Sequence, residues 1–353
     1  MPLSDAVVAW PRFDADLVRM TVLPPLNWDD TTVLLTGGTG SCGKAYLPRI
    51  LERGPKAVRI FSRDELKQSE LRAAYGEQEN VRYFVGDVRD VDRLRRAAYG
   101  CDLIVHAAAM KQVDTCEYNP FEAVQTNVHG AENIVNAALD VGVPRTIALS
   151  TDKAVNPINL YGATKLCGEK IFVQGNTYAA GDPVRFSCVR YGNVVGSRGS
   201  VIPLFLRQRE KGILTITDVR MTRFFITLAE AVEFVISSTE QMVGGEIFVP
   251  KIPSVRITEL ASAVAPDARQ ELIGIRPGEK LHEVLLMSDE ARHTIDCGDR
   301  YVVLPEFHAW SGDLPSGEPL PDGFVYSSDA NTQWLDREGV SVLFDAPEVA
   351  VGS

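Results

Sequence analysis

The sequence predicts an α/β fold, in which a doubly wound parallel sheet carries a smaller, discontinuous lobe. Short apolar, β-branched runs alternate with helix-like segments through the first half of the chain, and the first run leads into a glycine-rich loop. Strands with two apolar faces are typical of a parallel sheet covered by helices on both sides. Right-handed crossovers should connect these strands. Strands are expected at residues 32–36, 57–61, 81–85, 103–106, 146–149 and 184–190.

Helical periodicity fills the segments between these runs. It predicts helices at residues 44–53, 65–75, 92–98 and 121–141. Past residue 192 the alternation becomes irregular, with Gly, Pro and Arg spread through 197–223 and 252–283. This change indicates that the later chain builds the smaller lobe.

The composition excludes several classes of protein. The 353 residues are 45% hydrophobic, which is enough for a sizeable core, and the net charge of −11 argues against sequence-independent binding to nucleic acid or to an anionic membrane. The six cysteines form no CxxC pair and no Cys/His cluster with zinc spacing, so we expect reduced thiols and no metal site. No signal peptide or 18-residue apolar run is visible, and we expect a cytoplasmic protein.

The loop after the first strand has the spacing of a dinucleotide-binding motif. Gly37, Gly40 and Gly43 form a GxxGxxG pattern between a strand and a helix, with Thr39 and Ser41 between the glycines. Glycine permits a tight turn and a close approach of the backbone to a pyrophosphate, and the helix N-terminus adds N–H donors. The first domain is therefore predicted to be Rossmann-type and to bind a dinucleotide.

The end of the second strand selects the cofactor. Ser62, Arg63 and Lys67 are suited to a 2′-phosphate, whereas Asp64 keeps recognition of a ribose diol possible. We favour NADP over NAD. Further cofactor contacts are expected from Asp87 and Val88, which are placed to flank the adenine, and from Ala107, Ala108 and Asn127.

A tyrosine and a lysine follow the fifth strand at helical spacing. Tyr161 and Lys165 are four residues apart and share one helix face. An ammonium beside a phenol stabilises the phenolate and lowers the tyrosine pKa, so Tyr161 can accept the proton of an alcohol as its hydride leaves. Lys165 therefore joins Tyr161 in the expected cofactor and catalytic site.

Together these motifs resemble the extended short-chain dehydrogenase/reductase superfamily, and within it the inverting UDP-N-acetylglucosamine 4,6-dehydratases. The resemblance covers about residues 32–283. It is carried by residues 36–43, 62–67, 106–111, 126–128, 150–165, 190–194, 221–225 and 276–280. The pair Asp152 and Lys153 is its most specific mark of the inverting branch, since retaining dehydratases are expected to carry an Asp-Glu pair there.

The resemblance implies a role for each residue of the catalytic segment. Tyr161 would be the base on the 4-hydroxyl of the sugar, Asp152 the acid on the 6-hydroxyl, and Lys153 the base at carbon 5. Thr151 would hydrogen-bond the 4-hydroxyl. A lysine base needs a depressed pKa, which we expect from burial and from nearby Lys165. Reprotonation of carbon 5 from the opposite face would invert that carbon.

The resemblance also implies the nucleotide-sugar site and the domain layout. Arginine suits a diphosphate because it binds two oxygens at once. The expected substrate contacts are Lys111, Asn193, Ser200, Val201, Arg223, Arg276 and Glu279. Residues 31–190 would form the NADP-binding domain, with 228–250 returning to it. Residues 191–227 and 251–305 would form the substrate lobe, and 1–30 and 306–353 are extensions without an assigned role. We expect a homo-oligomer, a dimer or higher, formed through helices flanking Tyr161.

Two other functions remain open on the sequence alone. An epimerase would use the same 4-keto intermediate, although a simple 4-epimerase has no need of the elimination pair Asp152 and Lys153. A non-catalytic NADP-binding regulator would be expected to lose Tyr161 or Lys165, and both are present.

Overall fold

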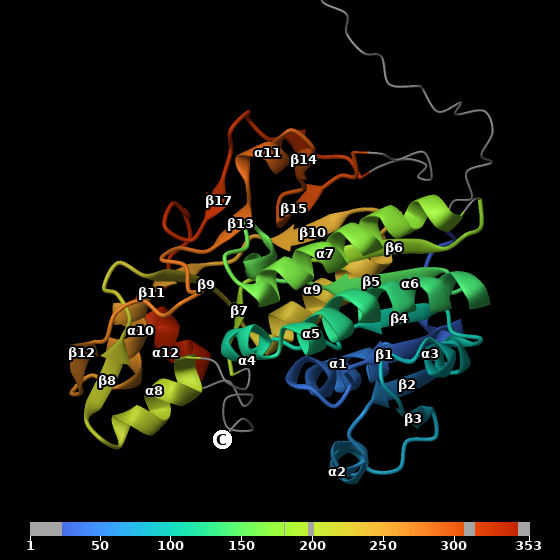
Figure 1. The fold of residues 1–353 in the computed structure, drawn as a ribbon, viewed down its shortest axis with the longest axis horizontal. Helices are drawn as coiled ribbons and strands as arrows, with labels where there is room; N and C mark the ends of the chain where they lie inside the picture. Colours follow the sequence, from blue (N-terminus) through green and yellow to red (C-terminus); the bar gives the residue numbers. More distant parts are fainter. Residues whose placement is uncertain (1–22, 180, 197–200, 307–314, 345–353) are drawn as a thin grey trace, which may run out of the picture.

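A computed structural model describes residues 23–179, 181–196, 201–306 and 315–344, and within them a ten-stranded sheet forms the centre (Figure 1). The sheet order is β16-β14-β15-β10-β6-β5-β4-β1-β2-β3, and the seven strands from β10 to β3 are parallel. This confirms the predicted α/β class. The parallel strands are β1 (Thr32–Thr36), β2 (Ala57–Ser62), β3 (Val81–Val85), β4 (Leu103–His106), β5 (Arg145–Leu149), β6 (Arg185–Val189) and β10 (Ile247–Pro250).

The central strands are apolar on both faces because helices cover both faces. β1, β4, β5 and β6 are buried at every position. Helices α3 (Val91–Ala98), α6 (Gly130–Val141) and α7 (Leu160–Gly175) pack together on one face. On the other face, α1 (Ser41–Leu51) packs against α9 (Leu228–Gln241). Helix α2 (Glu65–Tyr75) follows β2.

The helix that we expected at residues 121–141 is divided into three pieces. It consists of α5 (Pro120–Val124), a π-helical turn at Gln125–His129 and α6, and α4 (Val113–Tyr118) precedes them. Apolar periodicity does not distinguish α- from π-helical hydrogen bonding, so the turn could not be predicted from it. The turn buries Thr126 and Asn127 beside the catalytic helix α7.

Antiparallel strands extend the sheet beyond β10. They are β15 (Arg300–Val303), β14 (Thr294–Asp296) and β16 (Glu318–Pro319). We expected residues 251–305 in the substrate lobe, and 306–353 had no assigned role. The structure places β14 and β15 on the main sheet, and β16 joins them from the later segment.

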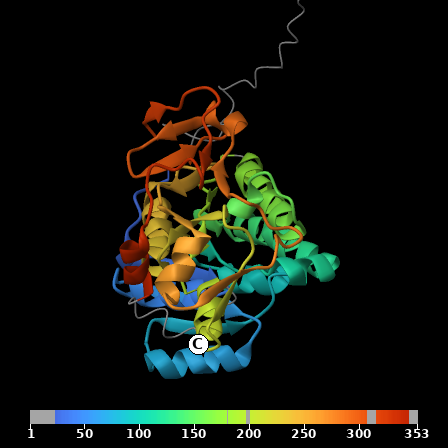
Figure 2. The ribbon, with the colours of Figure 1, turned by 90° about the vertical axis from the view of Figure 1, so that its left-hand side faces the viewer.

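The smaller lobe has its own apolar core. A three-stranded sheet joins β7 (Asn193–Val194), β9 (Thr222–Ile226) and β11 (Ser254–Arg256), and a parallel pair joins β8 (Ile213–Ile216) to β12 (Arg269–Leu272). Helices α8 (Val201–Arg209), α10 (Ile257–Val264) and α12 (Arg337–Phe344) complete it. Figure 2 shows α12, in red, beside α10, and Val340 of α12 is fully buried in this core.

A separate two-stranded sheet lies outside the main sheet. It pairs β13 (Val284–Leu286) antiparallel with β17 (Tyr326–Ser327), and α11 (Ser288–Ala291) follows β13. The remaining elements are short turns at Trp28–Asp30, Asp152–Ala154 and Asn176–Ala179. No helix in the described part of the chain is long and apolar enough to cross a membrane.

A buried arginine connects helix α7 and the end of β6 with the segment around β13 and α11. Arg190 follows β6 and donates to both carboxylate oxygens of Glu169 on α7, at 3.1 and 2.8 Å. It also donates to Glu290 on α11, at 3.0 and 2.9 Å, and to the carbonyl of Leu285. Arg190 and Glu169 are almost fully buried. A buried charge that loses its partner is strongly destabilising.

We expect Glu169→Gln to lower the free energy of unfolding by about 1.5–3 kcal/mol, because it removes buried charge-assisted hydrogen bonds to Arg190 while Glu290 still pairs with the guanidinium. Urea unfolding followed by circular dichroism measures the change. The matched control is Glu233→Gln, which removes an exposed ion pair with Arg53 and should change stability by less than about 1 kcal/mol. Equal effects of the two substitutions would contradict this role for the cluster.

Candidate active site

The candidate site is one cleft of about 1230 Å³ between the main sheet and the smaller lobe. The carboxyl ends of parallel strands meet at one edge of a sheet, and ligands of open α/β folds bind in the crevice there. The loops after β1, β2, β3, β4 and β5 line one part of this cleft. Residues from β7, α8, β9 and the segment 276–283 line the other part.

The glycine loop lies at the base of the cleft and fits its predicted role. Gly37 has φ +67°, and a Cβ there would lie 2.8 Å from the backbone of Ala108. A Cβ on Gly43 would lie 2.4 Å from Gly38, so helix α1 packs directly against the turn. Gly37, Thr39, Gly40 and Ser41 line the cleft, as do Ala107 and Ala108. The loop and the N-terminus of α1 thus form a cradle suited to a pyrophosphate.

The residues expected at the adenosine end lie together at the ends of β2 and β3. Arg63 pairs with Asp87 at 3.5 Å, and Lys67 pairs with Asp64 at 2.6 Å. The Asp64 side chain also caps α2 by accepting from the Lys67 amide, and these contacts with Lys67 lower the Asp64 pKa. Ser62 is buried, and its hydroxyl accepts a hydrogen bond from Gln68 Nε2. Val88 is buried at the same end of the cleft.

Asn127 stabilises a loop at the side of the cleft, but its side chain does not line the cleft. Its side chain accepts from the Met110 amide at 2.8 Å, and donates to the Met110 carbonyl at 2.9 Å and to Thr164 of α7 at 3.0 Å. The π-helical turn presents this amide to both neighbours. Asn127 therefore fixes the loop after β4 against the catalytic helix, and it is absent from the residues that line the cleft.

The start of α7 brings Tyr161 beside the segment after β5. Asn159 caps the helix by accepting from the Gly162 amide at 2.7 Å. A Cβ on Gly162 would lie only 2.0 Å from the carbonyl oxygen of Lys153, so no larger residue fits there. This contact sets Tyr161 next to Thr151 and Lys153, and all three line the cleft.

The environment of Tyr161 differs from our expectation. Burial raises the pKa of Tyr161 to about 12, although Lys153 and a hydrogen bond with Thr151 act in the opposite direction. Lys165 is not the cation that acts on this phenol, because its Nζ donates to the Leu149 carbonyl at 2.6 Å. Burial lowers the pKa of Lys165 itself. The effect on Tyr161 that we expected from Lys165 comes from Lys153 in this structure.

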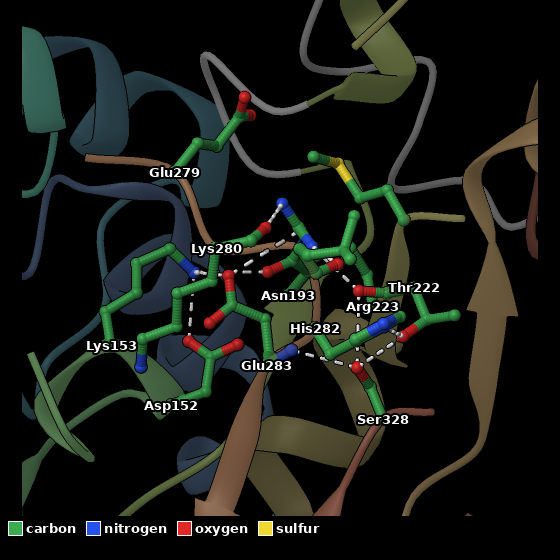
Figure 3. Close-up of polar contacts among 12 residues, drawn as sticks. Asp152, Lys153, Asn193, Thr222, Arg223, Glu279, Lys280, His282, Glu283 and Ser328 are labelled. Carbon is green, nitrogen blue, oxygen red and sulfur yellow. Dashed lines mark hydrogen bonds and ion pairs between the residues drawn. The ribbon is translucent and has the colours of Figure 1, made fainter. Parts of the chain in front are cut away.

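Lys153 lies at the centre of a cluster of charged and polar groups (Figure 3). Its Nζ is 2.9 Å from Asp152 Oδ1, 3.4 Å from Asn193 Oδ1 and 3.8 Å from Glu283 Oε1. Thr151 donates to the same Asp152 oxygen at 2.8 Å. Asp152 Oδ2 is buried without a hydrogen-bond partner among the described residues. The structure thus brings Thr151, Asp152, Lys153 and Asn193 together.

The pKa of Lys153 is raised, where we expected it to be depressed. Burial lowers it, but the carboxylates of Asp152 and Glu283 more than offset that effect, and Lys153 is an ammonium in this structure. The expectation overlooked Glu283, which lies 130 residues away in the sequence. We also expected Lys165 to lower the Lys153 pKa, but the cation that opposes the rise of this pKa is Arg223.

Arg223 lines the cleft, but its guanidinium is engaged by its own chain. It donates to the carbonyls of Thr222, Lys280 and Leu281 at 2.7 to 3.1 Å, and its Nε is 3.6 Å from Glu283. The side chain is buried. Arg223 therefore holds the segment 280–283 in place, and the diphosphate contact that we expected from it would need a rearrangement of these bonds.

The other expected substrate residues are spread along the rim of the cleft. Arg276 is exposed, and its backbone amide donates to Glu279 at 3.4 Å. Lys111 and Val201 also line the cleft, whereas Ser200 lies outside the described residues. Asn159 donates to the Gly278 carbonyl at 2.8 Å, which anchors this rim to the catalytic helix.

Sequence reasoning missed two residues near the centre of the cleft. Glu283 is buried against Lys153, and Lys280 donates to the Val155 carbonyl at 2.5 Å. Both lie in or just after the segment 276–280, which carried part of the resemblance. Polar residues at regular spacing in an otherwise irregular segment were the available signal, but only the fold shows that the segment returns to Lys153.

Comparisons with known proteins agree with this geometry. Residues 33–305 match the family described as polysaccharide biosynthesis protein. A Campylobacter jejuni protein named UDP-N-acetylglucosamine 4,6-dehydratase (inverting) is 50% identical over 317 residues, which cover 87% of this chain and 95% of the relative. A Rickettsia conorii protein named UDP-glucose 4-epimerase is 44% identical over 281 residues, covering 77% of this chain and 82% of the relative.

A solved structure has a similar fold. The X-ray structure of Pen from Bacillus thuringiensis superposes with a TM-score of 0.84 at 35% identity, covering 90% of this chain and 98% of that chain. A nicotinamide dinucleotide is the typical cofactor of such proteins, and the glycine loop described above fits it. The chain therefore belongs to the polysaccharide biosynthesis protein family, within the extended short-chain dehydrogenase/reductase superfamily.

Proposed function

We propose that this protein is an NADP-dependent, inverting 4,6-dehydratase of UDP-N-acetylglucosamine. The observation that carries the proposal is the convergence of Tyr161, Asp152 and Lys153 in one cleft with the glycine loop. Oxidation needs a base on an alcohol, and elimination needs a base and an acid on neighbouring carbons. The relatives named as dehydratases support the same reaction and substrate.

The first step is oxidation at carbon 4 of the sugar. Tyr161 takes the proton of the 4-hydroxyl while the hydride of carbon 4 departs, and Thr151 positions the hydroxyl and the phenol. When bound, the nicotinamide dinucleotide accepts this hydride and later returns it to carbon 6. The resulting ketone makes the neighbouring carbon 5 proton removable. Burial raises the pKa of Tyr161, so the phenol has to release its own proton to solvent before it can accept the proton of the 4-hydroxyl.

The second step is loss of water across carbons 5 and 6. Transfer of one proton along the 2.9 Å contact from Lys153 Nζ to Asp152 Oδ1 produces a neutral amine and a carboxylic acid together. The amine then takes the carbon 5 proton, and the acid protonates the departing 6-hydroxyl. The pair thereby returns to the ammonium and carboxylate of the resting structure, and no net proton is consumed.

The final step sets the configuration of the product. Carbon 5 takes a proton from solvent on the face opposite to the one it lost, and Tyr161 releases to solvent the proton that it took from the 4-hydroxyl. The product is the 4-keto-6-deoxy sugar with carbon 5 inverted, and the cofactor is regenerated.

The rim of the cleft is proposed to hold the nucleotide. Arg276 suits the diphosphate, and Glu279 suits the ribose hydroxyls. Lys111 and Asn193 lie nearer the sugar, and Val201 lies on the first turn of α8, where the base would pack. Arg223 orders the segment 280–283 behind these residues.

A 4-epimerase is the second candidate, because relatives named UDP-glucose 4-epimerase are 44% identical to the chain. An epimerase needs Tyr161 and the 4-keto intermediate but no acid for the 6-hydroxyl. The contact between Asp152 and Lys153 therefore favours elimination.

Incubation with UDP-N-acetylglucosamine and NADP separates the two reactions. We expect a product lighter by the mass of one water, measured by mass spectrometry, because Asp152 and Lys153 complete the elimination. A product of unchanged mass with altered sugar configuration would support the epimerase. Absence of turnover with any nucleotide sugar would contradict both.

Lys153→Ala tests the assigned base in the same assay. We expect water loss to slow by about 100- to 10,000-fold, while NADP still binds at the distant glycine loop. Lys56→Ala, on the loop before β2, is the control and should retain the wild-type rate. Normal dehydration by Lys153→Ala would show that another residue is the base at carbon 5.

Arg63 tests the choice of cofactor. We expect Arg63→Ala to weaken NADP binding about tenfold or more and to leave NAD binding nearly unchanged, because only NADP carries the 2′-phosphate. Fluorescence titration with both reduced cofactors measures this. Arg49→Ala removes an exposed arginine of α1 as the control. A wild-type preference for NAD would contradict the choice of NADP.

We also infer a homo-oligomer formed through the helices beside α7. Tyr118 at the end of α4 and Phe121 in α5 are more than four-fifths exposed, and both helices pack on α7. Burial of such aromatics in an interface is favourable. Light scattering should give at least a dimer, and Phe121→Glu should shift it toward the monomer. A monomeric wild-type protein would contradict the inference.

A further inference from the structure

A second carboxylate, in addition to that of Asp152, lies beside Lys153. Glu283 directly precedes β13, lines the cleft and is only 2% exposed. Its Oε1 lies 3.8 Å from Lys153 Nζ, and Figure 3 shows dashed lines from this nitrogen to both carboxylates. Glu283 Oε2 is buried without a hydrogen-bond partner among the described residues. The mechanism above assigns this residue no task.

Glu283 is held firmly from the smaller lobe. Its amide donates to Ser328 Oγ at 2.9 Å, and its carbonyl accepts from the Ser328 amide at 2.8 Å. Arg223 Nε lies 3.6 Å from the same carboxylate oxygen that faces Lys153. Arg223 also donates to three backbone carbonyls, which hold its guanidinium in place. The guanidinium in turn holds the Glu283 carboxylate.

The four groups form a row of alternating charge across the cleft. Asp152, Lys153, Glu283 and Arg223 run from the catalytic segment to β9 of the lobe. The side chains of Asp152, Glu283 and Arg223 are almost completely buried, whereas that of Lys153 is 26% exposed. Buried charges of this kind persist only when they are paired. Lys153, the proposed base, is therefore the most exposed group of the row.

We propose that Glu283 is a positioning residue for Lys153: it holds the amino group at the sugar and stabilises the positive charge that returns to Nζ when the carbon 5 proton is taken. This role rests on the proposed function. Asp152 alone would stabilise the positive charge on Lys153 poorly, because its carboxylate becomes the neutral acid when it takes the lysine proton. Glu283 keeps its charge throughout that exchange.

The charges around Lys153 predict the direction in which its pKa changes when the charge of Glu283 is removed. Carboxylates of Asp152 and Glu283 favour the ammonium, and Arg223 opposes it. Lys280, from the lobe segment, is also close enough to interact with Lys153. The neighbouring Asn193 is neutral, and Tyr161 is protonated at neutral pH because its pKa is raised. Removing the Glu283 charge must therefore lower the pKa of Lys153 and raise the fraction of neutral amine at any pH below that pKa.

The direct test is the rate at which acetic anhydride modifies Lys153, followed by mass spectrometry of its peptide. Glu283→Gln has nearly the same shape without the charge, and we expect Lys153 to react about tenfold faster at pH 9, because one pKa unit changes the amine fraction tenfold. Glu283→Asp keeps the charge and should react at a rate close to the wild type. An unchanged rate in Glu283→Gln would overturn the proposal.

Steady-state kinetics test the positioning itself. In Glu283→Gln we expect kcat for water loss to fall about 10- to 100-fold with little change in KM, and Glu283→Asp should recover part of that loss. Glu233→Gln, at the exposed ion pair with Arg53, should leave both constants unchanged. A kcat equal to wild type would overturn the proposal.

The two readouts separate this role from the proposed function. Lysine modification requires no turnover, so it reports on Glu283 even if UDP-N-acetylglucosamine is the wrong substrate. Failure of the wild-type chain to release water, with faster modification in Glu283→Gln, would overturn the proposed function and leave the Glu283–Lys153 contact supported.

Discussion

The site depends on one steric constraint, the close approach of helix α7 to the segment that follows β5. The carbonyl oxygen of Lys153 occupies the space that a side chain on Gly162 would need. This approach places Tyr161 beside Thr151 and Lys153, although the two segments belong to different layers of the fold. The proposed oxidation base and elimination pair are thus positioned by a backbone contact, which resists the small displacements that a flexible side-chain contact would allow.

The second organising feature is the row of charges from Asp152 to Arg223. Lys153 and Asp152 lie on the large domain, whereas Glu283 and Arg223 belong to segments that leave the main sheet. Their pairing across the cleft joins the two parts at the reacting carbons. It also explains the raised Lys153 pKa, since two carboxylates outweigh the cost of burying one ammonium. The chemistry then follows from moving a proton within the Lys153–Asp152 pair.

Local patterns in the sequence predicted most of the sheet. The two-sided apolar runs at β1 and β4 have the predicted bounds, because burial on both faces leaves a clear signal. The edge strand β3 also has the predicted bounds, although it is only partly buried. The glycine loop and the spacing of Tyr161 and Lys165 were equally visible. The π-helical turn, the antiparallel edge and Glu283 were not, because each depends on contacts between segments far apart in the chain. The hydrogen bond from Lys165 to the Leu149 carbonyl was not predictable either, because the spacing of Tyr161 and Lys165 does not show which group each side chain meets.

The central claim is that Asp152 and Lys153 make this fold an inverting dehydratase. The most direct measurement is the reaction of UDP-N-acetylglucosamine in deuterated water, with the product examined by NMR and mass spectrometry. The account predicts loss of one water, one deuterium at carbon 5 and inversion of that carbon. A product that keeps the configuration at carbon 5, or one that retains all its oxygen atoms, would contradict it.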